Sequence, residues 1–361
     1  MVFPSRKSEK AISGYSVNLI GALRKNNINT NEITYDAGKP RSIFKRLREL
    51  KRYNLVHIQH EYNLLGWFGL PFFLLFFLLN DKKCKIITTM HTVLSQKEEF
   101  RGSKIKNFLR KMLYWTQNRI IKKYSDKIIV HANFFKDILI REYGFSKDKI
   151  EILPQGIIKQ KKLILKNKAK KELNLSGNVY LIIGNFVPDH GADIIIRQAK
   201  EIGKTILVVI NPQAINDRNQ KRLKIHVKQC VDYVKNNNLS KYVRFDIGLI
   251  NDEKPEWWKY FSVADLILQP YKGGIGSGIF AHAMTAKKPV VASNILFFRE
   301  ISKKYGCIKI AEKEEDYPKI IKEAMRPKNY KEMVRECERY AKENSWNAIS
   351  KRLNKIYNNL L

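Results

Sequence analysis

Residues 264–293 have the sequence ADLILQPYKGGIGSGIFAHAMTAKKPVVAS, and this stretch decides the fold class of the chain. Leu266 to Leu268 form an apolar run with the length of a buried strand, and Pro289 to Ala292 form a second one. Between the two runs, a glycine-rich turn precedes apolar residues at a helical period. A strand, a turn, a helix and a strand in this order make a βαβ unit, which predicts a parallel sheet.

The glycine-rich turn is a candidate anion site. Gly276 and Gly278 let the backbone approach a ligand closely, and the helix that we expect to start near Ser277 offers free N–H groups to an anion such as a diphosphate. An ordinary turn that binds nothing has the same glycine content. Glycines alone therefore leave both interpretations open.

The same alternation of strands and helices continues along the whole chain. Apolar runs predict strands at 2–4, 33–35, 55–59, 85–90, 127–130, 150–153, 179–183, 205–210, 243–245, 266–268, 290–292 and 307–310. A length of 361 residues suits two similar α/β domains. We expect a first domain over 1–158, a lysine-rich linker over 159–175, a second domain over 176–342 and an amphipathic helix in 343–361.

The composition is strongly basic. Lys and Arg number 68 against 34 Asp and Glu, so the formal net charge is +34. Such a charge attracts a membrane surface, a nucleic acid or phosphorylated substrates. Nucleic acid is the least favoured of these partners because the sequence has no interleaved aromatic and basic motif. The 4 cysteines lie far apart, which indicates neither a disulfide framework nor a zinc site and favours the reducing cytoplasm.

Two segments suggest contact with a membrane. Leu64 to Leu79 is almost wholly apolar, but sixteen helical residues reach only about 24 Å, short of the roughly 30 Å hydrocarbon core. We favour a buried or half-buried helix there, with a membrane-dipping helix as the alternative. Lys104 to Lys123 has an apolar stripe beside basic residues, which fits either a solvated basic face or a dock for anionic lipid.

Polar side chains follow two of the predicted strands. His60 and Glu61 come after the run at 55–59, and His91 comes after the run at 85–90. The carboxyl ends of parallel strands are where open α/β sheets bind ligands. A neutral imidazole there could hydrogen-bond a ligand or the reacting centre, and Glu61 could orient a hydroxyl group of a ligand. A structural role is the alternative for each histidine.

Several motifs occur together in a fixed order: HIQHEYNLLG, TTMHTVL, IIGNFVPDHGADIII, the glycine-rich stretch quoted above, and SWNAISKRLNKIY at the end. Taken together, the chain resembles the family-4 type of GT-B glycosyltransferase, which is retaining and depends on a nucleotide-sugar. The resemblance implies two Rossmann-like domains facing across a cleft, with the acceptor on the first domain and the nucleotide-sugar on the second. It also implies that the final helix, in 343–361, crosses back to the first domain.

The resemblance assigns site residues. His91 matches the histidine placed beside the transferred sugar, His60 and Glu61 match the histidine-acid pair, and Gly14 matches the glycine of a loop near the donor phosphates. On the second domain, the expected donor-binding residues are Gly184, Asn185, His190, Lys272, Gly276, Ser277, Gly278 and His282.

The chain departs from the family pattern at four of its usual anchors. Asn185 and His190 stand where many members have Arg and Lys, and Gly274 and His282 stand where the usual pair of glutamates lies. Lys272, Ser277, the N–H groups of the loop and a protonated His282 or His190 are left to hold the phosphates.

The resemblance therefore implies a hexosyltransferase that moves a sugar from a nucleotide diphosphate donor to a lipid-linked or glycan acceptor, with retention of configuration. It implies no cofactor and no metal, because helix N-termini and cations hold the diphosphate. The protein is expected in the cytoplasm, or peripherally on the inner face of the membrane. The alternative is a degenerate GT-B protein that binds nucleotide or anionic polymer without turnover.

Overall fold

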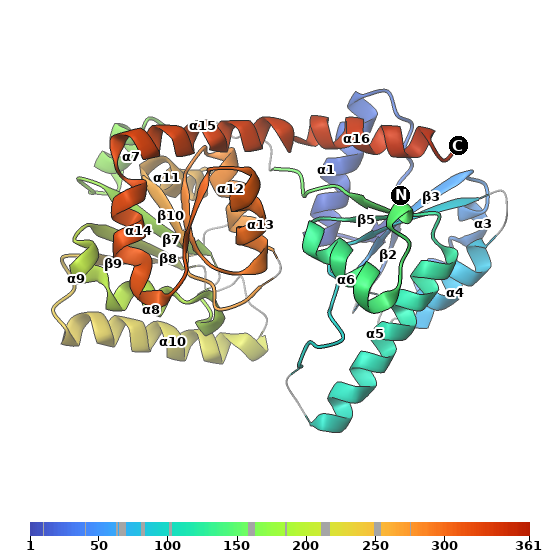
Figure 1. The fold of residues 1–361 in the computed structure, drawn as a ribbon, viewed down its shortest axis with the longest axis horizontal. Helices are drawn as coiled ribbons and strands as arrows, with labels where there is room; N and C mark the ends of the chain where they lie inside the picture. Colours follow the sequence, from blue (N-terminus) through green and yellow to red (C-terminus); the bar gives the residue numbers. More distant parts are fainter. Residues whose placement is uncertain are drawn as a thin grey trace. The chain divides into compact units, whose positions relative to one another are not determined.

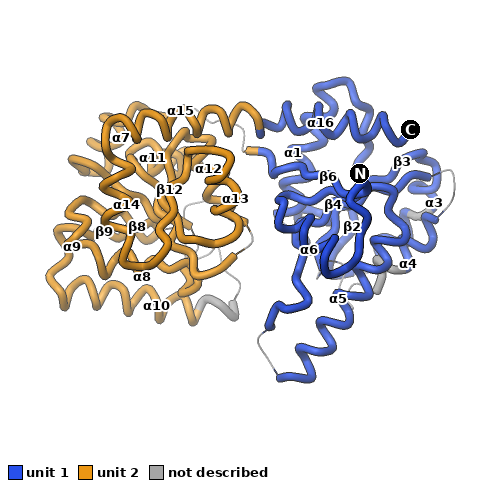
Figure 2. Tube along the Cα trace, viewed as in Figure 1, with its two compact units in different colours: residues 1–156, 344–361 blue, residues 157–343 orange. Residues whose placement is uncertain are grey.

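The computed structural model describes residues 1–9, 11–39, 41–62, 64, 70–80, 84–100, 103–157, 163–184, 186–210, 217–248, 254–274 and 276–361. The chain forms two compact units, which Figure 2 shows in different colours. Unit 1 consists of Met1–Gly156 together with Asn344–Leu361, and unit 2 consists of Ile157–Glu343. The last residues of the chain thus belong to the unit that contains the first ones.

Unit 1 is built on a six-stranded sheet with the order β2-β1-β3-β4-β5-β6. Each strand pairs with its neighbours in parallel. The strands are β1 (Val2–Pro4), β2 (Ile33–Tyr35), β3 (Leu55–His60), β4 (Lys85–Met90), β5 (Lys127–Val130) and β6 (Ile150–Ile152). The predicted apolar runs are confirmed as strands, within one residue at each end.

Helices cover both faces of this sheet (Figure 1). They are α1 (Ala11–Lys25), α2 (Arg41–Phe44), α3 (Leu47–Leu50), α4 (Leu70–Leu79), α5 (Lys104–Tyr124), α6 (Asn133–Tyr143) and α16 (Trp346–Asn358). One face packs with α1 and α16, where Leu19 and Leu353 meet Ile87 of β4. The other face packs with α4, α5 and α6. The predicted helix in 343–361 therefore returns to the first sheet, as α16.

Unit 2 contains a second six-stranded parallel sheet, with the order β12-β11-β10-β7-β8-β9. Its strands are β7 (Val179–Gly184), β8 (Thr205–Ile210), β9 (Val243–Ile247), β10 (Leu266–Gln269), β11 (Val290–Ser293) and β12 (Ile308–Ala311). Its helices are α7 (Lys166–Glu172), α8 (Ala192–Arg197), α9 (Ala199–Ile202), α10 (Asp217–Asn236), α11 (Pro255–Val263), α12 (Gly278–Thr285), α13 (Leu296–Lys304), α14 (Tyr317–Ala324) and α15 (Pro327–Glu343). The βαβ unit predicted from residues 264–293 is β10, α12 and β11.

The lysine-rich stretch that we expected to be a linker over 159–175 is partly a helix. Residues 166–172 form α7, and Ala169 on this helix is fully buried in the core of unit 2. Lys166 forms an ion pair with Asp265, and Lys259 of α11 lies 2.6 Å from Glu172. Because lysines dominate the composition here, the single apolar position that anchors the helix was not recognised as a packing signal.

The apolar segment Leu64–Leu79 is described only in part. Residues 65–69 lie outside the described residues, and α4 begins at Leu70. Leu75, Phe76 and Leu79 are buried, whereas Phe77 is 63% exposed. The predicted half-buried helix is confirmed for this part, and among the described residues no helix has the length and apolarity needed to span a bilayer.

The strand order of each sheet marks where a ligand can bind. In a doubly wound sheet, ligands occupy the crevice at the carboxyl ends of the two neighbouring strands from which the chain winds in opposite directions. In unit 1 these strands are β1 and β3, and in unit 2 they are β7 and β10. Most of the expected site residues lie in the segments that follow these strands or their neighbours.

Candidate functional site

Three histidines lie at the carboxyl edge of the sheet in unit 1. His60 ends β3, His91 follows β4, and His131 follows β5. Since β3, β4 and β5 are adjacent and parallel, these positions occupy one edge of the sheet. His91 and His131 are in contact, with His131 Nε2 at 3.2 Å from His91 Nδ1. His131 was not among the expected site residues, although it follows an apolar strand as His91 does.

Both ring nitrogens of His91 have protein partners. Its Nδ1 faces His131, and its Nε2 lies 2.9 Å from the side-chain oxygen of Gln59. Tyr15 of α1 packs edge-on against the ring, with the centroids 4.8 Å apart. A substrate hydroxyl could therefore bond to His91 only by replacing one of these two partners. The structure gives His91 a fixed orientation, which an isolated surface histidine would lack.

The histidines of unit 1 are held neutral at physiological pH. Burial lowers the pKa of His57 to about 3 and the pKa values of His60 and His131 to about 4. Burial, together with the neighbouring histidines, also holds the pKa of His91 well below its ordinary value. A neutral imidazole can donate one hydrogen bond and accept another, so the partners of each ring decide where its proton lies.

His60 lies apart from His91, on the other face of the sheet. It is fully buried, and its Nε2 lies 3.1 Å from the Gln117 side-chain oxygen on α5. Side chains alternate between the two faces along a strand, so His57 and Gln59 share the face toward α16 while His60 points away from it. The residue expected to act in catalysis is here a packed, hydrogen-bonded histidine, because the motif could not show which face it occupies.

Glu61 is the carboxylate of this edge. It follows β3 directly and is partly exposed, and the backbone N–H of Tyr62 donates to its Oε1 at 3.0 Å. Burial raises the pKa of Glu61, and a hydrogen bond from Thr92 acts in the opposite direction. A carboxylate with a raised pKa beside solvent suits the orientation of an acceptor hydroxyl.

Gly14 does not lie in a loop. It belongs to the first turn of α1, because the helix begins at Ala11. The N–H groups at this helix start are bonded to the side chain of Glu9, at 2.8 Å to Ala11, 2.7 Å to Ile12 and 3.2 Å to Ser13. The carboxylate thus occupies the position that an anion would take, so the expected contact between Gly14 and the donor phosphates has no support here.

In unit 2, the glycine-rich turn leads from β10 into α12. Ser277 is the N-cap of the helix, and its hydroxyl oxygen accepts from the N–H of Phe280 at 3.1 Å. The side-chain amide of Gln269 donates to the same oxygen at 2.9 Å. The Tyr271 hydroxyl lies 3.3 Å from it as well, so the Ser277 hydroxyl has a structural role with protein partners on every side.

The glycines of this turn differ in whether a side chain could replace the hydrogen. Gly274 has φ +142°, which L side chains rarely adopt, whereas a Cβ placed on Gly276 or Gly278 would meet nothing within 4 Å. Gly276 and Gly278 are exposed. The start of α12 therefore presents an open backbone surface, and the first N–H groups of a helix have no intrahelical partner.

The loop after β7 packs closely against the same turn. Gly191 has φ +66°, and a Cβ there would lie 1.9 Å from the carbonyl oxygen of Pro270. His190 stacks on Tyr271, with ring centroids 4.5 Å apart. Gly184 ends β7 with φ +118° and Ile279 beside it. Gly184 and His190 are thus next to the start of α12, and Asn185 lies outside the described residues.

Lys272 is the cation of this edge. It is exposed, and its Nζ lies 3.3 Å from a carboxylate oxygen of Asp193, which also binds Arg197 at 2.8 Å. Arg197 also pairs with Glu314 at 3.6 Å, so Lys272 is the cation that shares Asp193 with an already paired arginine. Lys272 can reach an anion at the start of α12 by exchanging its contact with Asp193.

His282 does not face the turn. It is buried with its ring among Trp257, Trp258 and Phe261 on α11. Its Nδ1 donates to the carbonyl oxygen of Gly278 at 2.7 Å. The expected contact of a protonated His282 with the phosphates is not supported. Its position on α12, four residues after Gly278, turns the side chain toward the core.

The comparisons with known proteins agree on the type of fold, and one of them matches the first part of the chain to a family. Residues 4–161 match the family model described as Glycosyltransferase Family 4. Sucrose-phosphate synthase from Thermosynechococcus elongatus is 16% identical with a TM-score of 0.70, over 99% of this chain and 98% of that chain. HepE from Anabaena, solved in complex with UDP-glucose, is 12% identical with a TM-score of 0.68, over 99% of both chains. No curated protein sequence matches the chain significantly.

The chain has the GT-B fold, and its residues 4–161 are similar to Glycosyltransferase Family 4. A further similar structure is that of WaaG, a glycosyltransferase involved in lipopolysaccharide biosynthesis, at 12% identity and a TM-score of 0.64 over 96% of this chain and 95% of that chain. Identities this low show the fold, and the family match covers residues 4–161 of the chain. The resemblance inferred from the ordered motifs is confirmed at this level.

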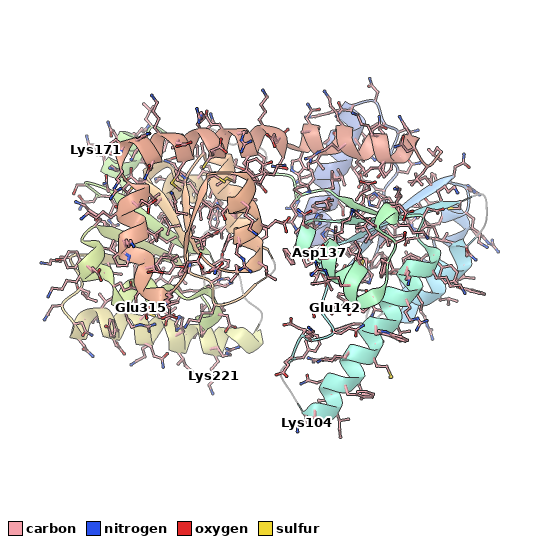
Figure 3. The ribbon with its side chains drawn as sticks, in the orientation of Figure 1. Lys104, Asp137, Glu142, Lys171, Lys221 and Glu315 are labelled. Carbon is pink, nitrogen blue, oxygen red and sulfur yellow. The ribbon has the colours of Figure 1, made fainter. Side chains whose placement is uncertain are left out.

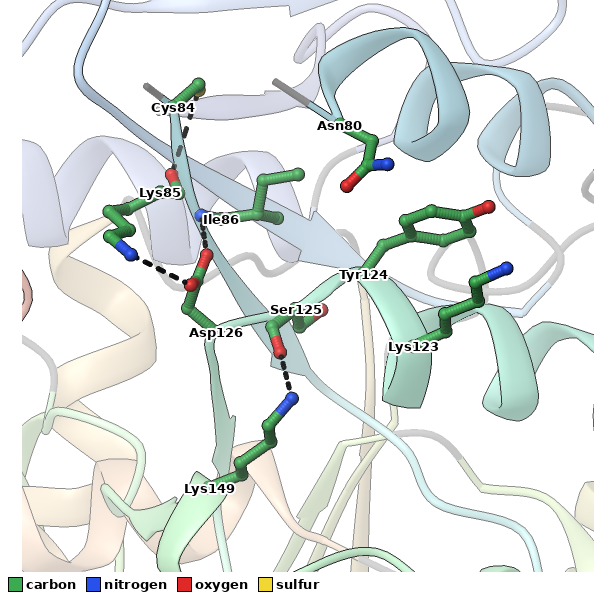
Figure 4. Close-up of a pocket in the computed structure, with 9 residues that line it drawn as sticks. All are labelled: Asn80, Cys84, Lys85, Ile86, Lys123, Tyr124, Ser125, Asp126 and Lys149. Atoms are coloured by element: carbon green, nitrogen blue, oxygen red, sulfur yellow. Dashed lines mark hydrogen bonds and ion pairs between the residues drawn. The ribbon is translucent and has the colours of Figure 1, made fainter. Parts of the chain in front are cut away.

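Among the described residues, a pocket lies at the opposite edge of the sheet in unit 1 (Figure 4). This pocket of about 430 Å³ lies at the amino ends of β4 and β5 and is lined by Lys85, Lys123 and Lys149 among others. Lys85 pairs with Asp126 at 3.4 Å, and Lys149 donates to the carbonyl oxygen of Ser125, the C-cap of α5. Cations complement the carbonyl end of a helix, so these lysines need no external anion.

In the part of the chain that the structure describes, no cluster of three or more His, Cys, Asp or Glu side chains is arranged to hold a metal ion.

Proposed function

We propose that the protein transfers a sugar from a nucleoside diphosphate donor to an acceptor at the inner face of a membrane, with retention of configuration. The single observation that carries the donor class is the exposed N-terminus of α12. It lies at the strand pair where the winding of the sheet reverses, beside an exposed lysine. HepE, which shares the fold over 99% of its chain, was solved with UDP-glucose.

The donor diphosphate would bind mainly to backbone groups. The N–H of Phe280 is already bonded to Ser277, so the N–H groups of Gly278 and Ile279 are the ones aimed at a ligand. The helix dipole adds attraction for an anion at the same place. Lys272 would neutralise part of the charge that develops on the departing diphosphate, and we propose that no metal ion is required.

A retaining reaction on one face of the sugar needs little acid-base chemistry from the protein. As the bond to the donor phosphate breaks, a phosphate oxygen accepts the proton of the attacking hydroxyl, so the nucleoside diphosphate leaves and the sugar joins the acceptor. Glu61 would orient that hydroxyl. His91, fixed between Gln59 and His131, would form one wall of the sugar site.

The membrane part of the proposal rests on α5. In its first half, Ile105, Phe108, Leu109 and Met112 are 73%, 66%, 51% and 51% exposed, so this stripe is not part of the core. Lys104, which Figure 3 labels in the first turn, and Lys106, Arg110 and Lys111 lie beside the apolar stripe. An exposed apolar stripe edged by cations fits the interface of an anionic bilayer. A lipid-linked acceptor would be reached there.

The function is tested by incubating the protein with UDP-, GDP- and ADP-linked hexoses and a polyprenyl-phosphate or lipid A acceptor fraction in vesicles. Release of nucleoside diphosphate together with a glycolipid product is the expected result, and NMR of the new glycosidic bond gives its configuration. Binding of a nucleoside diphosphate without release of product would support the degenerate binder instead.

The membrane contact is tested by sedimentation with vesicles across a salt series. Binding should require anionic lipid and weaken as salt rises, because screening shortens the range of attraction. Replacing Phe108 and Leu109 by Ser should abolish binding, whereas the matched change Ile225→Ser on α10, 49% exposed in unit 2, should not. Equal binding of all three proteins would overturn the assignment of α5.

A further inference from the structure

A continuous line of side chains crosses one face of the sheet in unit 1. It begins at the Tyr357 hydroxyl on α16, which lies 2.6 Å from His57 Nδ1. His57 Nε2 lies 3.3 Å from one end of the Gln59 amide and 2.7 Å from the Thr89 hydroxyl. The other end of the amide lies 2.9 Å from His91 Nε2. Every member from Tyr357 to Gln59 is buried.

The line ends on a backbone group, which decides where the protons lie. His131 Nδ1 is 2.8 Å from the carbonyl oxygen of Leu153, an atom that can only accept, so the proton of His131 is on Nδ1. His131 Nε2 then accepts from His91 Nδ1 at 3.2 Å. The neutral His91 therefore carries its proton on Nδ1, and its Nε2 needs a donor.

The amide of Gln59 supplies that donor in one of its two orientations. Its oxygen and nitrogen can exchange places about the last side-chain bond while both distances remain. With the oxygen toward His91, the imidazole must carry two protons, which burial and the neighbouring His131, His60 and His57 oppose. With the nitrogen toward His91, the reverse of the orientation in the structure, the imidazole is neutral. His57 then donates from Nε2 to the Thr89 hydroxyl and the amide oxygen, which lie on the same side of the ring. Tyr357 then donates to His57 Nδ1.

We propose that His131 is a positioning residue that fixes the tautomer of His91 and, through Gln59, the direction of the whole hydrogen-bond chain as far as Tyr357 on the C-terminal helix. In the neutral state every donor points the same way, from Tyr357 to the Leu153 carbonyl. Hydrogen bonds aligned in one direction polarise and strengthen each other in a buried setting. The role in turnover rests on the proposed function, whereas the tautomers do not.

The test is ¹⁵N NMR of histidine-labelled protein at neutral pH, which distinguishes a protonated from an unprotonated ring nitrogen. The parent should show His91 and His131 protonated on Nδ1 and His57 on Nε2. In His131→Phe, His91 should move its proton to Nε2, Gln59 should turn, and His57 should move its proton to Nδ1, although His131 does not touch His57. The matched control His226→Phe, a buried histidine of unit 2, should change neither ring.

A second variant keeps the test decisive if His131→Phe does not fold. In Gln59→Leu, His91 should keep its proton on Nδ1 because His131 still accepts from it, whereas His57 should lose its single tautomer. A His91 that changes tautomer in Gln59→Leu, or a His57 that is unchanged in His131→Phe, would overturn the proposal. Turnover measured in parallel should fall about tenfold in His131→Phe. If the parent shows the expected tautomers but has no turnover, the proposed function is refuted and the proposed chain of hydrogen bonds stands.

Discussion

The carboxyl edges of the two sheets are built in different ways. In unit 1, the edge consists of side chains that bind each other: His91 is held by Gln59 and His131, and the chain of contacts reaches α16. In unit 2, the edge consists of backbone that lies open, with Gly276 and Gly278 exposed and free of close neighbours. The edge in unit 1 therefore depends on which side chains are present, whereas the edge in unit 2 depends on how closely a ligand can approach the backbone.

The two edges should respond differently to acid. The pKa values of His57 and His60 are lowered by burial, so the unfolded chain binds protons that the folded unit 1 does not. Stability from such groups is present above about pH 6.5 and is lost as pH falls toward the folded-state pKa. By linkage, a fully buried histidine costs roughly 2 kcal/mol at pH 5. Hydrogen exchange by mass spectrometry at pH 7.5 and pH 5 should show unit 1 opening before unit 2. Opening of unit 2 first would contradict this contrast.

Close backbone packing should make Gly191 the most sensitive glycine of unit 2. In Gly191→Ala, the new Cβ collides with the Pro270 carbonyl and the residue must keep a positive φ, so the free energy of unfolding should fall by roughly 3 kcal/mol. Gly203→Ala is the matched control. It has φ +65° but only ordinary contacts, and it should cost about 1 kcal/mol. Chemical denaturation measures the free energy of unfolding of both variants. Equal losses would show that the surrounding backbone shifts and relieves the collision.

Side-chain dependence in unit 1 is tested by His91→Ala. Loss of the imidazole removes a wall of the sugar site and one partner each of Gln59 and His131, so turnover should fall about a hundredfold, the loss that a misplaced substrate can cause. Nucleoside diphosphate affinity should be nearly unchanged, because the donor diphosphate is assigned to unit 2. The melting temperature gives the fold control. Full turnover in a folded variant would remove His91 from the site.

Ser277→Ala tests whether the backbone of unit 2, and not this side chain, binds the donor. Because its hydroxyl caps α12 and accepts from Phe280 and Gln269, Ser277→Ala should lower the stability of unit 2 by about 1 kcal/mol. The fall in donor affinity should be small, since the backbone N–H groups remain. Thermal unfolding with and without UDP separates the two effects. A large loss of affinity at unchanged stability would mean that the hydroxyl is a main phosphate contact.

Much of the fold could be predicted from the sequence because buried parallel strands are short apolar runs with clear ends. The site could be predicted only in part. The motifs placed His60, His91 and Glu61 at strand ends, but the face on which His60 lies depends on strand register and helix packing. His282 and Gly14 were assigned as site residues by family position. The aromatic rings that surround His282 belong to α11, and the carboxylate at the start of α1 belongs to Glu9, and no motif marks either contact. His131 showed the same pattern as His91 and was overlooked.

The central claim, that unit 2 holds the donor diphosphate through its backbone, is tested most directly at Gly278. Proline is well tolerated at the first position of a helix but lacks an N–H, and Ser277 already has the extended conformation that precedes proline, with φ −147° and ψ 112°. Calorimetry with UDP, GDP and ADP should show that Gly278→Pro binds the preferred nucleotide about tenfold or more weakly, as for a charge-assisted bond of roughly 1.5–3 kcal/mol. Gly278→Ala should bind it like the parent. Equal affinity of the proline and alanine variants, both folded, would contradict the account.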